Sequence, residues 1–254
     1  MRVRKTPLLL LAVFMNYPTL SFATTEPQPL SKPQSETKIP SAQDNFLLPY
    51  SAVYSTVWKK GISLKVKGKQ ALSKLDGNDW QFVFSADSML ASLYESSIFH
   101  VKDHQIIPIL YEYKTSALGK KRSAILTFNW EKNLVRNDIK DKPWNLSINP
   151  NTLDKLSIQL QVRQDLKQGK NDFDYQIADG GHIKNWHFRR LQMETVNTKI
   201  GRFPAIKVIR TDNLGEGKKT AFWFAPTHDY LLVKLEHTED GESYQLDIES
   251  LSQP

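Results

Sequence analysis

Apolar and polar residues alternate along most of the chain from position 47 onward. Tyr50, Ala52 and Tyr54 fall on one side of an extended backbone, and Ser51 and Ser55 fall on the other. A period of two is the spacing of a β-strand that buries one face and exposes the other. The same alternation predicts further strands in the ranges 62–66, 80–86, 107–113, 124–130, 173–177, 183–196, 205–210, 220–225, 231–237 and 244–248.

Short connections separate these stretches. Asp76–Asp79, Asp179–Gly181 and Asp240–Gly241 have the Asp, Asn and Gly composition of tight turns. Roughly a dozen strands joined by hairpin-length turns predict a mainly β fold, an antiparallel barrel or a strongly curved half-barrel. Pro108 cannot donate a ladder hydrogen bond, so we expect it at a sheet edge or at a bulge.

One segment has a helical period instead. Leucines at positions 153, 156, 160 and 166 approximate one face of a helix, and Asn151–Asp154 has the composition of a helix start. We therefore predict one main helix, Leu153–Lys167, packed on or into the sheet. A shorter helical or irregular piece is expected at Ser88–Tyr94, where three apolar residues cluster between strands.

The first 23 residues have the three parts of a secretory signal peptide. Met1–Lys5 is basic, residues 7–15 are apolar, and small residues flank a cleavage site before Thr24. The apolar run is shorter than the about 20 residues that span a bilayer. Residues 24–45 are rich in Pro, Ser and Thr and predict a flexible tether, so a single β-rich domain is expected over 46–254.

The leader and the composition predict a soluble periplasmic protein, with secretion into the medium as the alternative. The chain has no cysteine, so no thiol accepts a lipid after the leader, and the protein is not expected to be a lipoprotein. The formal charge of +7 falls to +4 (7 − 3) when the three basic residues of the leader are removed. This mild excess favours weak attraction to anionic lipid or polysaccharide over nucleic acid binding.

Residues that carry chemistry are present, but not in catalytic spacings. The six histidines lack the carboxylate–histidine spacing of a zinc enzyme, and no Gly-x-Ser-x-Gly elbow occurs. Thr227–Asp229 contains a histidine but has the composition of a hairpin loop. Asp172 and Asp174 share a strand face that we expect to be solvated. The sequence therefore predicts a protein that is not an enzyme, with no catalytic residue, metal site or cofactor.

Large aromatic side chains recur on the predicted strands. They either fill the interior of a barrel, as side chains do in small barrels, or line a cavity for an apolar ligand such as an acyl chain. Composition does not separate these two readings. The candidate cavity residues are Trp80, Phe82, Phe84, Tyr111, Tyr113, Phe128, Trp130, Trp186, Phe188 and Trp223.

The second half of the chain resembles a known family. Residues 198–205 read TKIGRFPA, and KVIR, TAFWFAP and DYLLVKL follow in that order. With the leucine-bearing helix and Arg163 upstream, this order is similar to that of a bacterial exported family, domain of unknown function three-one-zero-eight, over nearly all of 47–251. Leu232 stands where the family pattern leads us to expect proline. The family has no assigned reaction, so the resemblance implies no catalytic residue.

The same strand ending is more distantly similar to periplasmic lipoprotein carriers, whose open β-barrel is closed by helices over an apolar cavity. That likeness implies a fold and carries no activity with it. We therefore expect a non-enzymatic binding or carrier protein of the cell envelope for an apolar or lipid-like ligand. The alternative is an interaction module whose surface docks envelope proteins or glycans. Neither reading involves nucleic acid or stable membrane insertion after the leader is cleaved.

Overall fold

The computed structural model describes residues 47–253, except 61, 90, 118, 140–141, 213, 215–217 and 240. All of these residues belong to the second of two units into which the chain divides, Asp44–Pro254. The predicted signal peptide, 1–23, and tether, 24–45, lie outside the described residues. Within the described part, no helix is long and apolar enough to cross a membrane.

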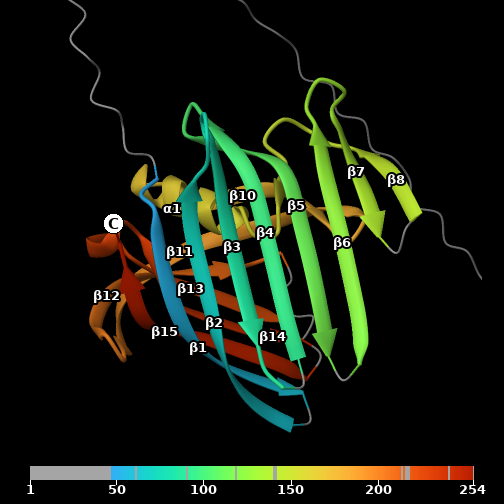
Figure 1. Cartoon of the computed structure of the whole chain (residues 1–254). Helices are drawn as coiled ribbons and strands as arrows, with labels where there is room; N and C mark the ends of the chain where they lie inside the picture. Colours follow the sequence, from blue (N-terminus) through green and yellow to red (C-terminus); the bar gives the residue numbers. More distant parts are fainter. Residues whose placement is uncertain are drawn as a thin grey trace, which may run out of the picture. The chain divides into compact units, whose positions relative to one another are not determined.

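The described strands hydrogen-bond into one sheet of 15 strands (Figure 1). Helical residues are confined to α1, Ile158–Lys167, and a 3-10 turn, η1, Pro226–His228, within this described part. The strands are β1 Tyr50–Lys60, β2 Ile62–Lys74, β3 Asp79–Asp87, β4 Ala91–Lys102, β5 Gln105–Ala117, β6 Lys120–Asn129, β7 Leu134–Ile139, β8 Lys142–Ser147, β9 Leu153–Asp154, β10 Asp172–Asp179, β11 His182–Thr198, β12 Gly201–Arg210, β13 Lys219–Ala225, β14 Leu231–Glu239 and β15 Glu242–Ser252.

The chain enters this sheet at its centre. β1 pairs antiparallel with β2 on one side and with β15 on the other. From β1 the chain runs outward strand by strand to β8, which forms a first wing. β9 and α1 then lead to the opposite edge, where β9 pairs parallel with β10. The strands β10 to β15 return to β1 as an antiparallel second wing.

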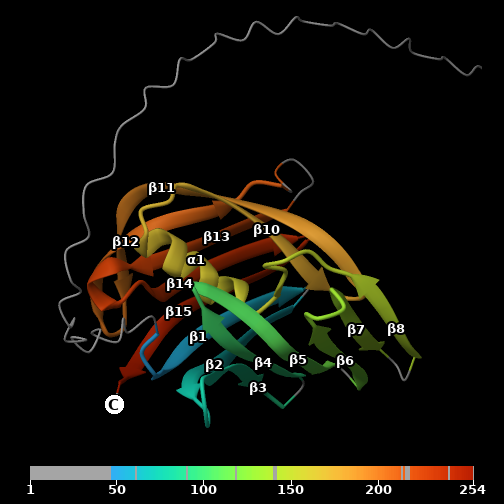
Figure 2. The same ribbon diagram turned by 90° about the horizontal axis from the view of Figure 1, so that it is seen from above.

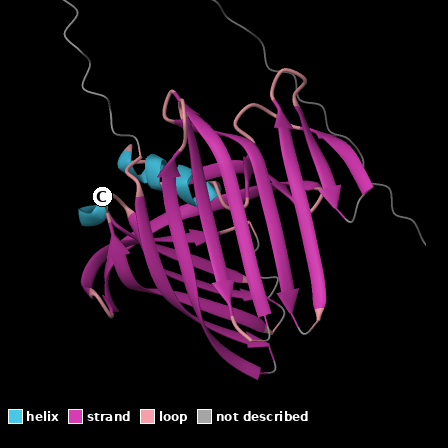
Figure 3. Ribbon diagram, in the orientation of Figure 1, coloured by secondary structure: helices cyan, strands magenta, loops and turns pink. Residues whose placement is uncertain are grey.

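The two wings curve toward each other and leave α1 on the concave side (Figures 1 and 2). Figure 3 shows strands throughout this unit, with the helical residues gathered at one end. The predicted fold, a strongly curved antiparallel half-barrel with one main helix packed into it, is confirmed. The sheet does not close on itself, because β8 and β9 form its two edges.

Side chains link the two wings near these edges. The Trp144 ring of β8 lies so close to Gly181, in the turn after β10, that a Cβ atom at Gly181 would overlap it. Beyond β8, the Asn149 N–H donates to Gln176 Oε1 of β10 at 3.0 Å. Thr152 Oγ1 donates to the same oxygen at 2.7 Å. Packing and side-chain hydrogen bonds therefore hold this seam.

Antiparallel pairing collects the turns at two ends of the half-barrel. At the first, the helix end, Gln161 Nε2 of α1 donates to the His104 carbonyl between β4 and β5 at 3.3 Å. Arg163 of α1 reaches Asp229 between η1 and β14 at the same end. The second, the open rim, carries the turns β1–β2, β3–β4, β5–β6, β12–β13 and β14–β15. The helix thus plugs one end of the interior only.

The observed helix is shorter than the predicted one. It begins at Ile158, whereas Leu153 and Asp154 form β9. Asp154 Oδ1 accepts hydrogen bonds from the N–H groups of Leu156 and Ser157 at 2.8 and 2.7 Å. This side chain organises a turn before the helix, as Asp does when it competes with helical hydrogen bonding. Leu160, as the helical period predicts, is buried.

The period of two did not predict the strands β4, β7 and β8. Ser88–Tyr94 is not helical, because β4 begins at Ala91 after a short turn, and β7 and β8 also lie outside the predicted ranges. Glu95 and Ser97 of β4, and Asn137 of β7, are polar residues at inward positions, opposite Phe84, Phe82 and Leu126. Pro108 lies opposite Phe99 where the β4–β5 register shifts, which confirms the predicted bulge.

Candidate functional site

Eight of the ten candidate cavity residues lie on the concave face of the sheet. Cross-strand register places them there, because directly paired residues point to the same face. Phe84 pairs with Glu95 and Glu95 with Tyr113, and in the second wing Phe188 packs on Tyr175, whose hydroxyl donates to Asp165 of α1. These eight are Trp80, Phe82, Phe84, Tyr111, Tyr113, Phe128, Trp186 and Phe188.

The other two candidates lie elsewhere. Trp130 follows the end of β6, stacks on Phe128 and donates through Nε1 to the Pro108 carbonyl at 2.7 Å. Trp223 is a correction, because it lies on the outer face. Its Nε1 donates to Glu194 Oε2 at 3.0 Å, and Lys207 lies over its ring. Trp223 therefore does not share the concave face with the eight residues named above.

Burial varies among the aromatic side chains of the concave face. Tyr54, Phe82 and Phe99 are fully buried. Farther from the helix end, Phe84, Tyr113, Trp186, Phe222 and Tyr244 are only partly buried although they pack against the core. The part of the concave face nearer the rim therefore keeps aromatic surface that the protein's own side chains do not seal.

A cluster of ionisable residues faces this less filled region, and we call it the Lys155 cluster. Lys155 lies in the turn between β9 and α1, where its Nζ is 3.6 Å from Asp179 Oδ1 of β10 and 5.5 Å from the centre of the Tyr113 ring. Strands of both wings thus meet at one amine. The members are Glu95, Tyr111, Tyr113, Lys155, Asp179 and Tyr244.

A rigid turn positions Lys155. The neighbouring Asp154 is fully buried and accepts a hydrogen bond from Ser97 Oγ of β4 at 2.6 Å. Its other carboxylate oxygen accepts the two backbone hydrogen bonds that precede α1. The carboxylate thus ties the first wing to the helix, and it fixes the backbone from which Lys155 extends. Burial raises the pKa of Asp154, against these hydrogen bonds.

The surroundings shift the pKa values of the three charged members in different ways. Burial raises the pKa of Glu95, although the nearby Lys155 ammonium acts in the opposite direction. Burial alone would lower the pKa of Lys155, but the carboxylates of Glu95 and Asp179 raise it above its ordinary value. Burial acts to raise the pKa of Asp179, yet Lys155 and Lys184 bring it below its ordinary value. Charged Lys155 and charged Asp179 therefore lie beside the Glu95 carboxyl group, whose raised pKa favours protonation.

Two tyrosines of the cluster, Tyr111 and Tyr244, remain neutral. Burial raises the pKa of Tyr244 to about 12. Burial and the Glu95 charge raise the pKa of Tyr111 well above its ordinary value. The Tyr111 hydroxyl faces Glu95 without a hydrogen bond of ordinary geometry, and the buried Thr56 Oγ1 and Trp186 Nε1 also have no partner among the described residues. Buried polar groups in proteins are nearly always hydrogen-bonded, so these atoms require an explanation.

A second polar network lies at the helix end. Tyr50 and Tyr54 both donate to Gln70 Oε1, at 2.8 and 3.2 Å, and Gln70 Nε2 donates to Gln159 Oε1 of α1 at 3.2 Å. The Arg163 guanidinium lies 5.3 Å from the centre of the Tyr50 ring. These residues join the helix to the two central strands. They are buried among closely packed neighbours, which suits a structural role.

The remaining sequence candidates occupy other places. Asp229, from the Thr227–Asp229 triplet, binds Arg163 Nη2 at 2.9 Å and Lys167 Nζ at 2.6 Å, so its carboxylate serves ion pairs. Asp172 and Asp174 are exposed, and each pairs with a residue of β11. No group of three or more His, Cys, Asp or Glu residues that could hold a metal ion occurs among the described residues.

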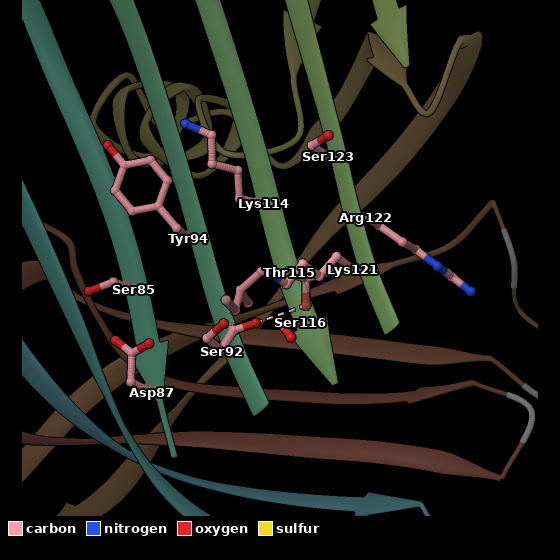
Figure 4. Close-up of a pocket in the computed structure, with 11 residues that line it drawn as sticks. Ser85, Asp87, Ser92, Tyr94, Lys114, Thr115, Ser116, Lys121, Arg122 and Ser123 are labelled. Carbon is pink, nitrogen blue, oxygen red and sulfur yellow. Dashed lines mark hydrogen bonds between the residues drawn. The ribbon is translucent and has the colours of Figure 1, made fainter. Parts of the chain in front are cut away.

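The outer face of β3–β6 carries a shallow depression of about 570 Å³. Figure 4 shows Tyr94, Lys114 and Ser123 of its lining on the side of the sheet turned away from α1. Hydroxyl and basic groups dominate the lining, and Lys114 Nζ lies 5.8 Å from the centre of the Tyr94 ring. This outer surface is separate from the interior cluster.

Sequence reasoning missed the Lys155 cluster. Glu95 and Asp179 are far apart in the chain and come together only through the curvature of the sheet and the β9–α1 crossover. One local signal exists, because Glu95 and Ser97 occupy alternate positions that lead to the apolar Phe99. Polar residues at inward positions of a strand mark either a satisfied network or a site.

The fold belongs to a β-barrel-like class that is known from crystallography. A β-barrel-like protein of domain of unknown function DUF1849 from Brucella abortus has a TM-score of 0.57 at 8% sequence identity, over 82% of this chain and 98% of that chain. A domain assigned to outer membrane lipoprotein sorting from Vibrio parahaemolyticus has 12% identity over 81% of this chain and 85% of that chain, but its TM-score of 0.26 does not indicate a common fold.

The sequence identifies the family within this class. The profile described as protein of unknown function, DUF3108, matches residues 56–249. This match spans most of the chain, so the protein belongs to the DUF3108 family. No curated protein matches the sequence.

Proposed function

We propose that this chain is a non-enzymatic periplasmic carrier that holds a lipid-like ligand on the concave face of its half-barrel. The observation that carries the proposal is the region around the Lys155 cluster. There, partly buried aromatic rings and buried polar atoms without partners face the same interior. Ligand sites in proteins combine mostly apolar walls with a few polar anchors in this way.

The arrangement suits an amphipathic molecule. Phe84, Tyr113 and Tyr244 offer apolar surface for hydrocarbon, and the Lys155 ammonium offers a charge-assisted donor for a carbonyl or anionic head group. Because α1 plugs the helix end and side chains hold the seam, the ligand would reach the apolar surface from the open rim. The raised pKa values of Tyr111 and Tyr244 keep these two hydroxyls protonated at neutral pH, so they can donate without adding charge. The leader that the sequence predicts supports a periplasmic location for such a carrier.

Native mass spectrometry of the protein purified from its own periplasm tests the proposal. We expect a lipid-like molecule in near-stoichiometric amount, which solvent extraction releases. Ala124→Trp fills the interior, because Ala124 lies opposite Tyr113 on the concave face. This variant should lose the molecule. Ser123→Trp, one residue earlier and exposed on the outer face, is the matched control and should retain it. A folded native protein that carries no ligand would remove the proposal.

The outer depression supports a second candidate, a module that docks envelope glycans. Hydroxyl and basic side chains such as Ser123, Lys114 and Tyr94 line it, and these groups suit hydrogen bonding to sugars. The same two variants separate the candidates. In sedimentation with isolated peptidoglycan, Ser123→Trp should abolish binding and Ala124→Trp should not. The reverse pattern, or no sedimentation, would contradict glycan docking.

A further inference from the structure

The open rim carries two apolar side chains that the described residues leave exposed. Met89, in the turn between β3 and β4, is fully exposed, and Leu214, in the β12–β13 connection, is 54% exposed. The first turn belongs to one wing and the second to the other. Because both connections lie at the rim end of their strands, the two side chains stand on opposite sides of the same opening. Apolar tips placed around an opening are unlike the scattered apolar residues of an ordinary surface.

Exposed basic residues accompany these tips. Lys120, Lys121 and Arg122 follow the β5–β6 turn at the rim and are all exposed. Lys59, near the end of β1, and Lys219, at the start of β13, are exposed at the same end. Two acidic groups of the rim are neutralised within the protein. Asp212 pairs with Arg210, and Glu239 pairs with Lys218. Asp87, exposed at the end of β3, and Glu242, at the start of β15, also lie at the rim. The five exposed basic residues outnumber these two, so the described rim residues keep a local excess of positive charge.

We infer that the open rim docks onto an anionic lipid surface. Apolar side chains on turn tips can enter the boundary between head groups and acyl chains, while lysine and arginine side chains around them bind anionic head groups. The basic residues would suit an anionic membrane or an acidic protein. The two apolar tips favour the membrane, because an acidic protein would give them no apolar layer to enter. The inference rests on the proposed function only for its purpose, since docking at this end would bring the interior ligand site against the bilayer.

Vesicle flotation tests the inference with the purified protein. We expect flotation with phosphatidylcholine vesicles that contain phosphatidylglycerol, much less with phosphatidylcholine alone, and release at high salt. Each basic residue near an anionic surface raises the partition coefficient onto the membrane roughly fivefold. The Lys120→Glu/Lys121→Glu/Arg122→Glu variant should therefore bind at least about 100-fold more weakly. Met89→Glu/Leu214→Glu should also lose most of its binding.

Matched controls keep the test specific to the rim. Met193→Glu changes a side chain that is likewise 54% exposed but lies on β11 opposite Ile206. Lys132→Glu reverses an exposed charge in the β6–β7 turn, at the helix end. Both variants should float like the unmodified protein. Equal loss in the controls, or flotation that the rim variants do not change, would overturn the inference, and so would failure to bind anionic vesicles.

The outcomes separate this inference from the proposed function. A protein that carries a lipid in native mass spectra but does not float with vesicles would retain the carrier proposal and refute membrane docking. A protein that floats through its rim but has no bound lipid would do the opposite. Retention of the Met89→Glu/Leu214→Glu variant on an immobilised acidic protein, with no vesicle binding by the unmodified chain, would identify a protein partner and also refute the inference.

Discussion

Substitution of either partner of the Arg163–Asp229 ion pair should cost a different amount of folding stability. The Arg163 side chain is 2% exposed and Asp229 is 24% exposed. Arg163 Nη2 donates to both Asp229 Oδ2 and the Asp229 carbonyl at 2.9 Å, while its Nε and Nη1 have no partner among the described residues. The guanidinium therefore depends heavily on one carboxylate for compensation of its charge.

Asp229→Asn keeps the size, an acceptor oxygen and tolerance of the left-handed backbone that Asp229 adopts at φ 53°. Removing one partner of a buried ion pair typically costs about 3–5 kcal/mol. Partial exposure of Asp229 and retention of the carbonyl hydrogen bond reduce this, so we expect a loss of about 2 kcal/mol in the free energy of unfolding. Arg163→Met removes the buried charge and leaves Asp229 bound to Lys167, and it should cost about 1 kcal/mol or less.

Urea unfolding followed by tryptophan fluorescence measures both losses, and the expected fall in Tm for Asp229→Asn is about 4–8 °C. The double variant should resemble Arg163→Met alone, because the unpaired cation is then gone. Asp172→Asn is the control, since Arg189 Nε contacts Asp172 at the same 2.9 Å but both side chains are more than half exposed. It should change stability by less than about 0.5 kcal/mol. A loss for Asp229→Asn no larger than that for Arg163→Met would refute the reasoning.

Two further predictions concern the cluster and the seam. Burial raises the pKa of Glu95 above its ordinary 4.5, so stability from this group is present below pH 4.5 and is lost as pH rises through the raised pKa. The stability of Glu95→Gln relative to the unmodified protein should therefore increase from pH 4 to pH 7 in urea titrations, and a constant difference would contradict this. Gly181→Ala places a Cβ against Trp144 at φ 81°, whereas Gly180→Ala, at φ 59°, meets open space. Gly181→Ala should be less stable than Gly180→Ala by about 1 kcal/mol in the same assay. When Trp144→Ala is combined with each variant, the difference between the two should disappear.

Alternation along the chain predicts the architecture well where one face of a strand is apolar throughout. Tyr50, Ala52 and Tyr54 are buried as the pattern requires, and the same holds for Phe173 and Ile177. The pattern fails in β4 because Glu95 and Ser97 point inward, toward Lys155 and Asp154. Local rules are often broken at functional or strained positions, so this failure and the candidate site have one cause.

The site itself depends on long-range geometry that periodicity does not contain. Lys155 was part of a predicted helix, and only the competition of the Asp154 side chain with the helix backbone places it in a turn. Trp223 could not be separated from Trp186 by alternation alone, because both lie on strands with bulky residues at several adjacent positions. The predicted signal peptide and tether remain predictions.

The pairing of β1 with β15 has a consequence for how the molecule assembles. Ser51 lies opposite Ser252, so the central ladder joins the two extremes of the described chain. During synthesis, β1 keeps a free hydrogen-bonding edge until β15 has been made, and such an edge can pair with other molecules. Contacts this distant in sequence also form slowly. A chain truncated before β15 should therefore aggregate. Correct folding requires that the sheet assembles after β15 has been made.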